Sequence, residues 1–217
     1  MGNTVPVSLG EKVFSKLEMG ILSGEIPRGK QLVECNICEK YGVSRTPVRD
    51  ALKTLEKKHL IEITPNKGAI VLGITKKDIL DIYDVRLCIE GLACYLAAEH
   101  FSDEASLSSL KEALELSEFY AKKKNSSQMQ ELDFSFHSII YKMSENRALG
   151  DTLSSFHHIT CAYRQKALSD ENRAKKALEE HRRIFEAIKS GDKEAAAKFA
   201  KIHIQNAKDN LSKTQID

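Results

Sequence analysis

The sequence predicts a mainly α-helical protein, with three helices and a β-hairpin in the N-terminal third and a bundle of six helices in the remainder. Three observations support this fold class. Apolar residues recur at intervals of three and four over most of the chain, which is the period of a helix packed on one side. No proline occurs after Pro65, so nothing interrupts long helices there. Hydrophobic residues make up 41% and aromatic residues only 6% of the 217 residues, a composition typical of soluble helical proteins.

The N-terminal third begins with an amphipathic helix over residues 9–22. A second, shorter helix is expected over residues 34–41, followed by a turn that begins at Gly42. Ser44 is a good N-cap for a third helix, in which Pro47 occupies the tolerated first turn. Val48, Ala51, Leu52 and Leu55 form an apolar stripe on one face of this third helix, so its basic side chains lie on the other faces. A short helix, a turn and a second helix with basic residues at its start make a helix-turn-helix.

Two β-type runs, over residues 60–64 and 69–72, follow the third helix and are joined by a turn of Pro, Asn, Lys and Gly. Three helices and a hairpin make a winged helix-turn-helix. Residues 40–58 carry six Lys or Arg against two Asp or Glu, although the whole chain has a net charge of only +2. Duplex DNA attracts such a local positive excess, because binding releases cations condensed on its backbone. The sequence therefore predicts a DNA-binding domain over residues 1–74.

The residues around the third helix carry a resemblance to a known family. The run GVSRTPVRDAL at residues 42–52, followed by Leu55, Glu56 and the wing glycine Gly68, resembles the DNA-binding domain of the GntR family of bacterial transcription regulators. His59 stands where that family usually has glycine. The resemblance implies that DNA is contacted by residues of the third helix and of the wing, namely Ser44, Arg45, Thr46, Arg49, Lys67 and Gly68.

Arginine suits this role, because its guanidinium can donate two hydrogen bonds to one guanine. Threonine can bond a base edge or a phosphate. The alternative for Arg45 and Arg49 is a solvated helix face, with salt bridges to Asp50 or Glu56.

Residues 75–217 predict six helices joined by short connections, an arrangement typical of an antiparallel bundle. The first helix is expected from about residue 75 to residue 100, and the second from about residue 102 to residue 124. Residues that commonly begin helices then recur near residues 126, 146, 170 and 192.

The chemistry of this bundle lies in its histidines. Asp133 and His137 stand four residues apart and therefore project from one face of a helix, while His181 and His203 lie on the last two helices. One carboxylate and three imidazoles suit a first-row divalent ion, and they leave coordination positions for water or a ligand. Spacing alone does not establish a metal site, because scattered histidines are often capped or lie at the surface.

A second resemblance covers this region. The segment DVR at residues 84–86 with Ile89 and Glu90, the Asp133 and His137 pair, the run from Glu180 to Asp192, and His203 resemble the FCD domain, the ligand-sensing domain of FadR-type GntR regulators. This resemblance implies a bound metal ion with a small organic acid beside it, and the donor set suits zinc, or else nickel, manganese or iron. The metal ligands that it implies are Asp133, His137, His181 and His203.

Other polar residues are candidates for contacts with this effector. Arg86 could hold an acidic group, or it could form a salt bridge with the glutamate four residues later, and both readings stay open. Arg164 and Asn206 are further candidates. His157 and His158 are adjacent, so at most one of them faces the core, and a surface or capped role is the simpler reading.

The sequence thus predicts a cytoplasmic, ligand-responsive repressor rather than an enzyme, binding a pseudo-palindromic double-stranded DNA operator as a homodimer. No apolar stretch is long enough for a membrane span, and the N-terminus has no signal-peptide core. Two alternatives stand beside this prediction. One is a regulator that responds to the metal itself or to oxidation of Cys35 and Cys38, and the other is a metal-dependent enzyme built on the bundle.

Overall fold

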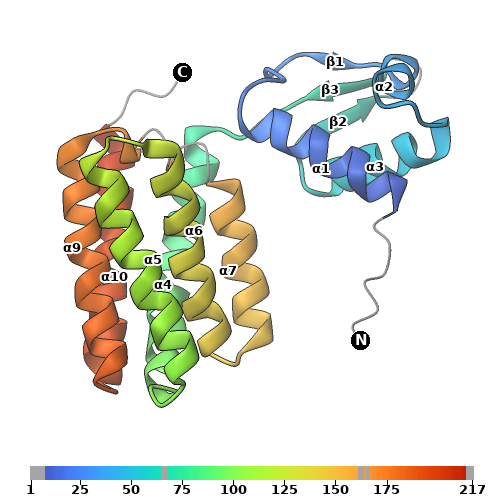
Figure 1. Ribbon diagram of the computed structural model, residues 1–217. Helices are drawn as coiled ribbons and strands as arrows, with labels where there is room; N and C mark the ends of the chain where they lie inside the picture. The colour runs from blue at the N-terminus through green and yellow to red at the C-terminus, as the bar shows by residue number, and fades with distance from the viewer. Residues whose placement is uncertain (1–7, 65–67, 161–163, 165–166, 214–217) are drawn as a thin grey trace. The chain divides into compact units, whose positions relative to one another are not determined.

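The computed structural model describes residues 8–64, 68–160, 164 and 167–213. The chain divides into two compact units, Met1–Thr75 and Lys76–Asp217. Helices dominate both units, and the mainly α-helical fold class is confirmed (Figure 1). Within the described residues, no helix is long and apolar enough to cross a membrane.

The first unit is a winged helix-turn-helix, as predicted. Its helices are α1 (Leu9–Leu22), α2 (Glu34–Tyr41) and α3 (Arg45–Lys57), and its strands are β1 (Gln31–Leu32), β2 (Ile61–Thr64) and β3 (Gly68–Val71). The strands form an antiparallel sheet in the order β1-β3-β2. Strand β1 was not predicted, because a strand of two residues has no alternation to detect. The predicted buried stripe of α3, formed by Val48, Ala51, Leu52 and Leu55, lies in the core of this unit.

Helix α3 ends in a left-handed turn at His59, whose φ is +56°. The N–H of His59 donates to the carbonyl of Glu56 at 2.8 Å, and the N–H of Leu60 donates to the carbonyl of Leu55 at 3.0 Å. These two bonds form a Schellman motif, in which glycine is the usual residue at the left-handed position. The helix end is therefore closed, although a histidine occupies the position that favours glycine.

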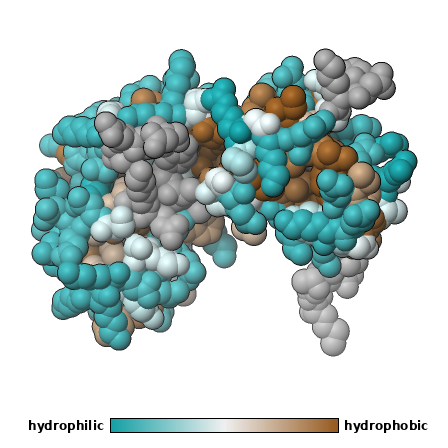
Figure 2. All heavy atoms as spheres, turned by 90° about the horizontal axis from the view of Figure 1, so that it is seen from above, coloured by the Kyte–Doolittle hydropathy of each residue, from teal (hydrophilic) through white to brown (hydrophobic). Residues whose placement is uncertain are grey.

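In the described part of the second unit, six helices form a bundle (Figure 1): α4 (Lys76–Glu99), α5 (Glu104–Lys122), α6 (Ser126–Met143), α7 (Arg147–Ile159), α9 (Glu171–Lys189) and α10 (Lys193–Lys213). Four of them begin behind an Asp or Asn whose side chain accepts from a backbone N–H. Asn146 and Asp170 are caps that the sequence suggested, whereas Asn125 takes the place of the suggested Ser126. The cap of α5 is Asp103 and not the neighbouring Ser102. Hydrophilic residues cover most of the bundle face seen in Figure 2, as expected of helices that bury one apolar side.

Candidate metal centre and nucleic-acid interface

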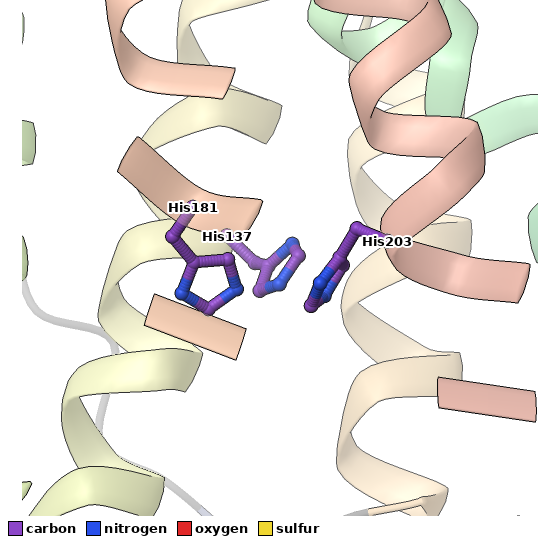
Figure 3. A group of neighbouring side chains, drawn as sticks. All are labelled: His137, His181 and His203. Atoms are coloured by element: carbon purple, nitrogen blue, oxygen red, sulfur yellow. The ribbon is translucent and has the colours of Figure 1, made fainter. Parts of the chain in front are cut away.

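Three histidines from three helices meet inside the bundle (Figure 3). His137 belongs to α6, His181 to α9 and His203 to α10, and none of them is more than 4% exposed. One ring nitrogen from each lies within 4.8 Å of the others. The Nε2 atoms of all three are buried and make no hydrogen bond. Buried polar atoms are nearly always partnered, so three facing nitrogens without partners fit a divalent ion better than an ordinary core.

Buried carboxylates orient two of these rings. Nδ1 of His203 lies 2.7 Å from Oε2 of Glu180, and Nδ1 of His137 lies 3.1 Å from Oε1 of Glu90. A carboxylate at Nδ1 fixes the tautomer whose Nε2 lone pair is free, and it makes that nitrogen a better metal ligand. The environment of the cluster therefore supports metal binding through Nε2.

Burial holds the pKa values of His157, His181 and His203 well below their usual range. These rings are accordingly neutral near pH 7. The neutral imidazole is the form that binds a metal ion, because protonation occupies the lone pair that the metal needs.

Asp133 lies beside the histidine cluster and is only 5% exposed. Its Oδ2 accepts a hydrogen bond from Nη2 of Arg164 and lies 3.2 Å from Nε2 of His157. Its Oδ1 lies 3.6 Å from Nε2 of His181. Burial opposes ionisation of this carboxyl, but the charge of Arg164 and the contact with His157 hold its pKa well below the ordinary value. Asp133 is therefore ionised, within reach of the cluster, and already paired with an arginine.

Arg86 is fully buried on α4 and forms a salt bridge with Glu90, which is one of the two roles that the sequence left open. Its Nε donates to Oε2 of Glu90 at 3.0 Å, while the hydroxyl of Tyr141 donates to Oε1 of the same carboxylate at 2.6 Å. Burial opposes the charged form, yet the charge of Glu90 raises the pKa of Arg86 above its ordinary value. Both Nη atoms of Arg86 are buried without a partner. The salt bridge uses Nε and leaves this fork of donors unused.

Asn206 lies outside the histidine cluster. Its side chain is exposed and donates to Oε1 of Glu180 at 2.9 Å. It lines a surface pocket of about 600 Å³ between α9 and α10. The guanidinium of Arg173 holds the same carboxylate with two bonds of 3.1 and 3.0 Å. In this structure Asn206 therefore touches the cluster only through Glu180.

The sequence assigns no role at this site to Tyr141 and Arg173. It marks Glu90 and Glu180 only within the FCD resemblance, with Glu90 as a possible partner of Arg86, and it favours a surface or capped role for His157. A usable signal existed for His157, because Leu149, Leu153 and His157 follow one another at intervals of four on α7 and all three are buried. For Glu180 no such signal existed. It directly precedes His181, so the two side chains leave the helix in different directions, and only the packing of α10 on α9 brings Glu180 to His203.

Four of the six predicted DNA-contacting residues lie at the N-cap or in the first turns of α3. Ser44 occupies the N-cap position, although its side chain makes no capping hydrogen bond. Arg45, Thr46 and Arg49 are exposed. Gly68 begins β3 with a φ of +82°, where a side chain would be strained. Lys67 lies outside the described residues.

Arg49 forms an ion pair that the sequence did not suggest. Its Nε donates to both carboxylate oxygens of Glu34 on α2, each at 3.0 Å, rather than to Asp50 or Glu56. The side chain of Arg49 is 57% exposed, so water weakens this pair. The pair with Glu34 therefore holds Arg49 only weakly.

Two family profiles match the chain. The profile described as "Bacterial regulatory proteins, gntR family" matches residues 9–71, and the FCD domain profile matches residues 81–206. The chain belongs to the GntR family of bacterial regulatory proteins. Its second unit carries the FCD domain of that family, so this GntR regulator has the two-domain architecture that both resemblances implied.

Two relatives and a solved structure agree with this assignment. The regulator is 30% identical to the gluconate operon transcriptional repressor of Bacillus subtilis over 193 residues, which cover 86% of this chain and 78% of that protein. It is 33% identical over 215 residues to the HTH-type transcriptional regulator YieP of Escherichia coli, covering 88% of this chain and 90% of that protein. The structure of E. coli McbR/YncC matches with a TM-score of 0.77 at 25% identity, covering 95% and 98% of the two chains. The protein is a DNA-binding transcription regulator, and both relatives are named as transcriptional regulators.

Proposed function

We propose that this GntR regulator represses a metabolic operon and is controlled by a small organic acid that binds at a divalent metal ion in the FCD domain. The observation that carries the proposal is the cluster of three buried histidines whose Nε2 atoms have no partner. A bound divalent ion would supply a Lewis-acidic centre for a carboxylate. Some relatives bear the name of operon repressors, which supports the expected sign of regulation.

Four side chains are proposed to hold the ion, namely Asp133, His137, His181 and His203. A ligand set rich in imidazole suits zinc best, with nickel, manganese or iron as alternatives. The unused fork of Arg86 is a donor for an acidic group of the effector, and Arg164 and Asn206 are further candidates.

Metal counting tests the centre. His181→Ala and His203→Ala should each lower the metal content that elemental analysis finds in the purified protein, because each removes a ligand. His158→Ala is the matched control, since His158 is an exposed histidine on α7. Equal metal content in the two cluster variants and in the control would rule the centre out.

The DNA-binding part of the proposal assigns base or phosphate contacts to Arg49 and its neighbours on α3, in a homodimer that reads a pseudo-palindromic operator. An operator can be selected from random duplexes with the wild-type protein. Arg49→Ala should then abolish retention of this duplex in a gel shift, while Arg147→Ala, which removes an exposed arginine of α7, should not. Unchanged retention by Arg49→Ala would refute the assignment.

A further inference from the structure

Three buried pairs of an arginine and a carboxylate stand around the histidine cluster, and their side chains are no more than 10% exposed: Arg86 with Glu90, Arg164 with Asp133, and Arg173 with Glu180. Each carboxylate lies next to one histidine of the cluster. The formal charges of the three pairs cancel, and an imidazole that binds a metal ion adds no charge because its lone pair must be free. A divalent ion would therefore bring two uncompensated positive charges into a buried site, which is costly unless an anion accompanies it. A ligand with two negative charges restores neutrality, whereas a ligand with one does not.

Arg164 has donors available for such an anion. It is 7% exposed, and its Nη2 donates to Asp133, while its Nε and Nη1 are buried and make no hydrogen bond. His157 contacts the other side of the same carboxylate through Nε2. Its Nδ1 is also buried without a hydrogen-bond partner, but with Nε2 donating to Asp133 the neutral ring leaves Nδ1 as an acceptor. A carboxylate accepts hydrogen bonds from guanidinium N–H groups, so the free Nε and Nη1 of Arg164 point to an acidic group that is not part of the protein.

A pocket of about 360 Å³ reaches these groups from the side of α6 and α7. Of the residues that line it, Arg164 and His157 are buried, while Ser127, Glu131, Phe134 and His158 are exposed. Glu131, at the exposed end, disfavours an anion there, and it already accepts a hydrogen bond from a glutamine. The positive charge in this pocket is that of Arg164, and it therefore lies at the buried end, beside the histidine cluster.

We propose that Arg164 is the subsite for a second carboxylate, and that the effector is a small dicarboxylate whose first carboxylate binds the metal ion. This inference rests on the proposed metal-dependent sensing of an organic acid. It also predicts cooperation between metal and effector. Arg164 holds Asp133, one of the proposed metal ligands, so the guanidinium and the metal ion compete for that carboxylate. A dicarboxylate gives Arg164 another anion, releases Asp133 to the metal, and thereby favours both binding events.

The test is isothermal titration calorimetry on the full-length, zinc-loaded protein with malonate, succinate and glutarate, each compared with its monomethyl ester. At least one diacid should bind at least tenfold more tightly than its ester. In Arg164→Gln this ratio should fall below threefold, and in Arg164→Lys, which keeps the charge without the fork, it should lie between the two. Arg147→Gln, an exposed arginine variant, should keep the wild-type ratio.

Zinc affinity provides a second readout, measured by competition with a chromophoric chelator. Arg164→Gln should bind zinc at least threefold more tightly than wild type, because a competing cation has been removed. Loss of affinity for both zinc and diacid in Arg164→Gln would overturn the proposal, because it would show that Arg164 supports the fold and is not a subsite. Equal affinities for diacids and esters would also overturn it, while leaving the metal-dependent sensor intact. Failure of the wild type to bind zinc, or to bind any acid, would refute the proposed function as well.

Discussion

Replacing Glu90 by Gln tests how strongly the buried charges of the FCD domain depend on one another. The substitution keeps the shape of the side chain and an oxygen that can accept from Tyr141. It removes the negative charge that lies 3.0 Å from Nε of Arg86. Both side chains are almost completely buried, at 1% and 0% exposure, so the arginine would be left as an uncompensated charge in the core. Breaking a buried pair in this way costs about 3–5 kcal/mol.

Circular dichroism during heating of the metal-free protein measures this cost. The chain has two compact units, so two transitions are expected, and the transition that zinc shifts belongs to residues 76–217. In a unit of this size, each kcal/mol changes the melting temperature by roughly 3 °C. Glu90→Gln should therefore lower the melting temperature of the FCD domain by roughly 10–15 °C.

Two further variants separate charge from shape. Glu115→Gln breaks the pair of Glu115 with Lys111, which has the same spacing but side chains that are 64% and 62% exposed, and it should leave the transition almost unchanged. The double variant Arg86→Met/Glu90→Gln leaves no buried charge at this place and should recover most of the lost stability. A fall of less than about 3 °C in Glu90→Gln, or a double variant no better than the single one, would refute the reasoning.

Three more predictions concern the metal and the end of α3. Glu180→Gln should weaken zinc binding about 10–100-fold, because a neutral amide orients His203 and raises its basicity less than a carboxylate does. Asn206→Ala, which loses a contact with the same carboxylate, should change zinc binding little, and equal effects in chelator competition would contradict this role. His59→Gly should stabilise the first unit by about 1 kcal/mol, because glycine adopts a φ of +56° without strain. A lower melting temperature of the first unit in this variant would show that the histidine makes a compensating contact. Removing a bound metal with a chelator should lower the melting temperature of the FCD domain alone, and an unchanged transition would count against the centre.

Local signals were sufficient to predict most of the fold. The first two helices begin and end at the predicted residues, 9–22 and 34–41, because apolar spacing and a following glycine mark them within a few residues of sequence. Strand β1 carries no such signal. Its two residues become a strand only because Gln31 and Leu32 pair with β3, which lies more than 30 residues later in the chain.

The same distinction between local and distant contacts applies to the candidate site. The histidines could be selected from the sequence because the resemblance to the FCD domain marks their positions, whereas their spacing alone did not establish a site. The carboxylates that orient them could not, because each acts on a ring from another helix: Glu90 of α4 on His137 of α6, and Glu180 of α9 on His203 of α10. The role of Asp133 as a ligand stays a prediction, because its nearest cation in this structure is Arg164.

The pairing of Arg164 with Asp133 also bears on how binding could alter DNA affinity. A ligand shifts a conformational equilibrium only by the difference in its affinity for the two states. If Arg164 and the metal ion compete for the carboxylate of Asp133, two local states follow. In one, Arg164 holds Asp133; in the other, Asp133 binds the metal ion while Arg164 holds the effector. Asp133 lies on α6 and Arg164 lies between α7 and α9, so the exchange breaks a buried link between two parts of the bundle. An acid with a single carboxylate would occupy the metal without breaking that link, and we therefore expect it to bind without changing operator affinity.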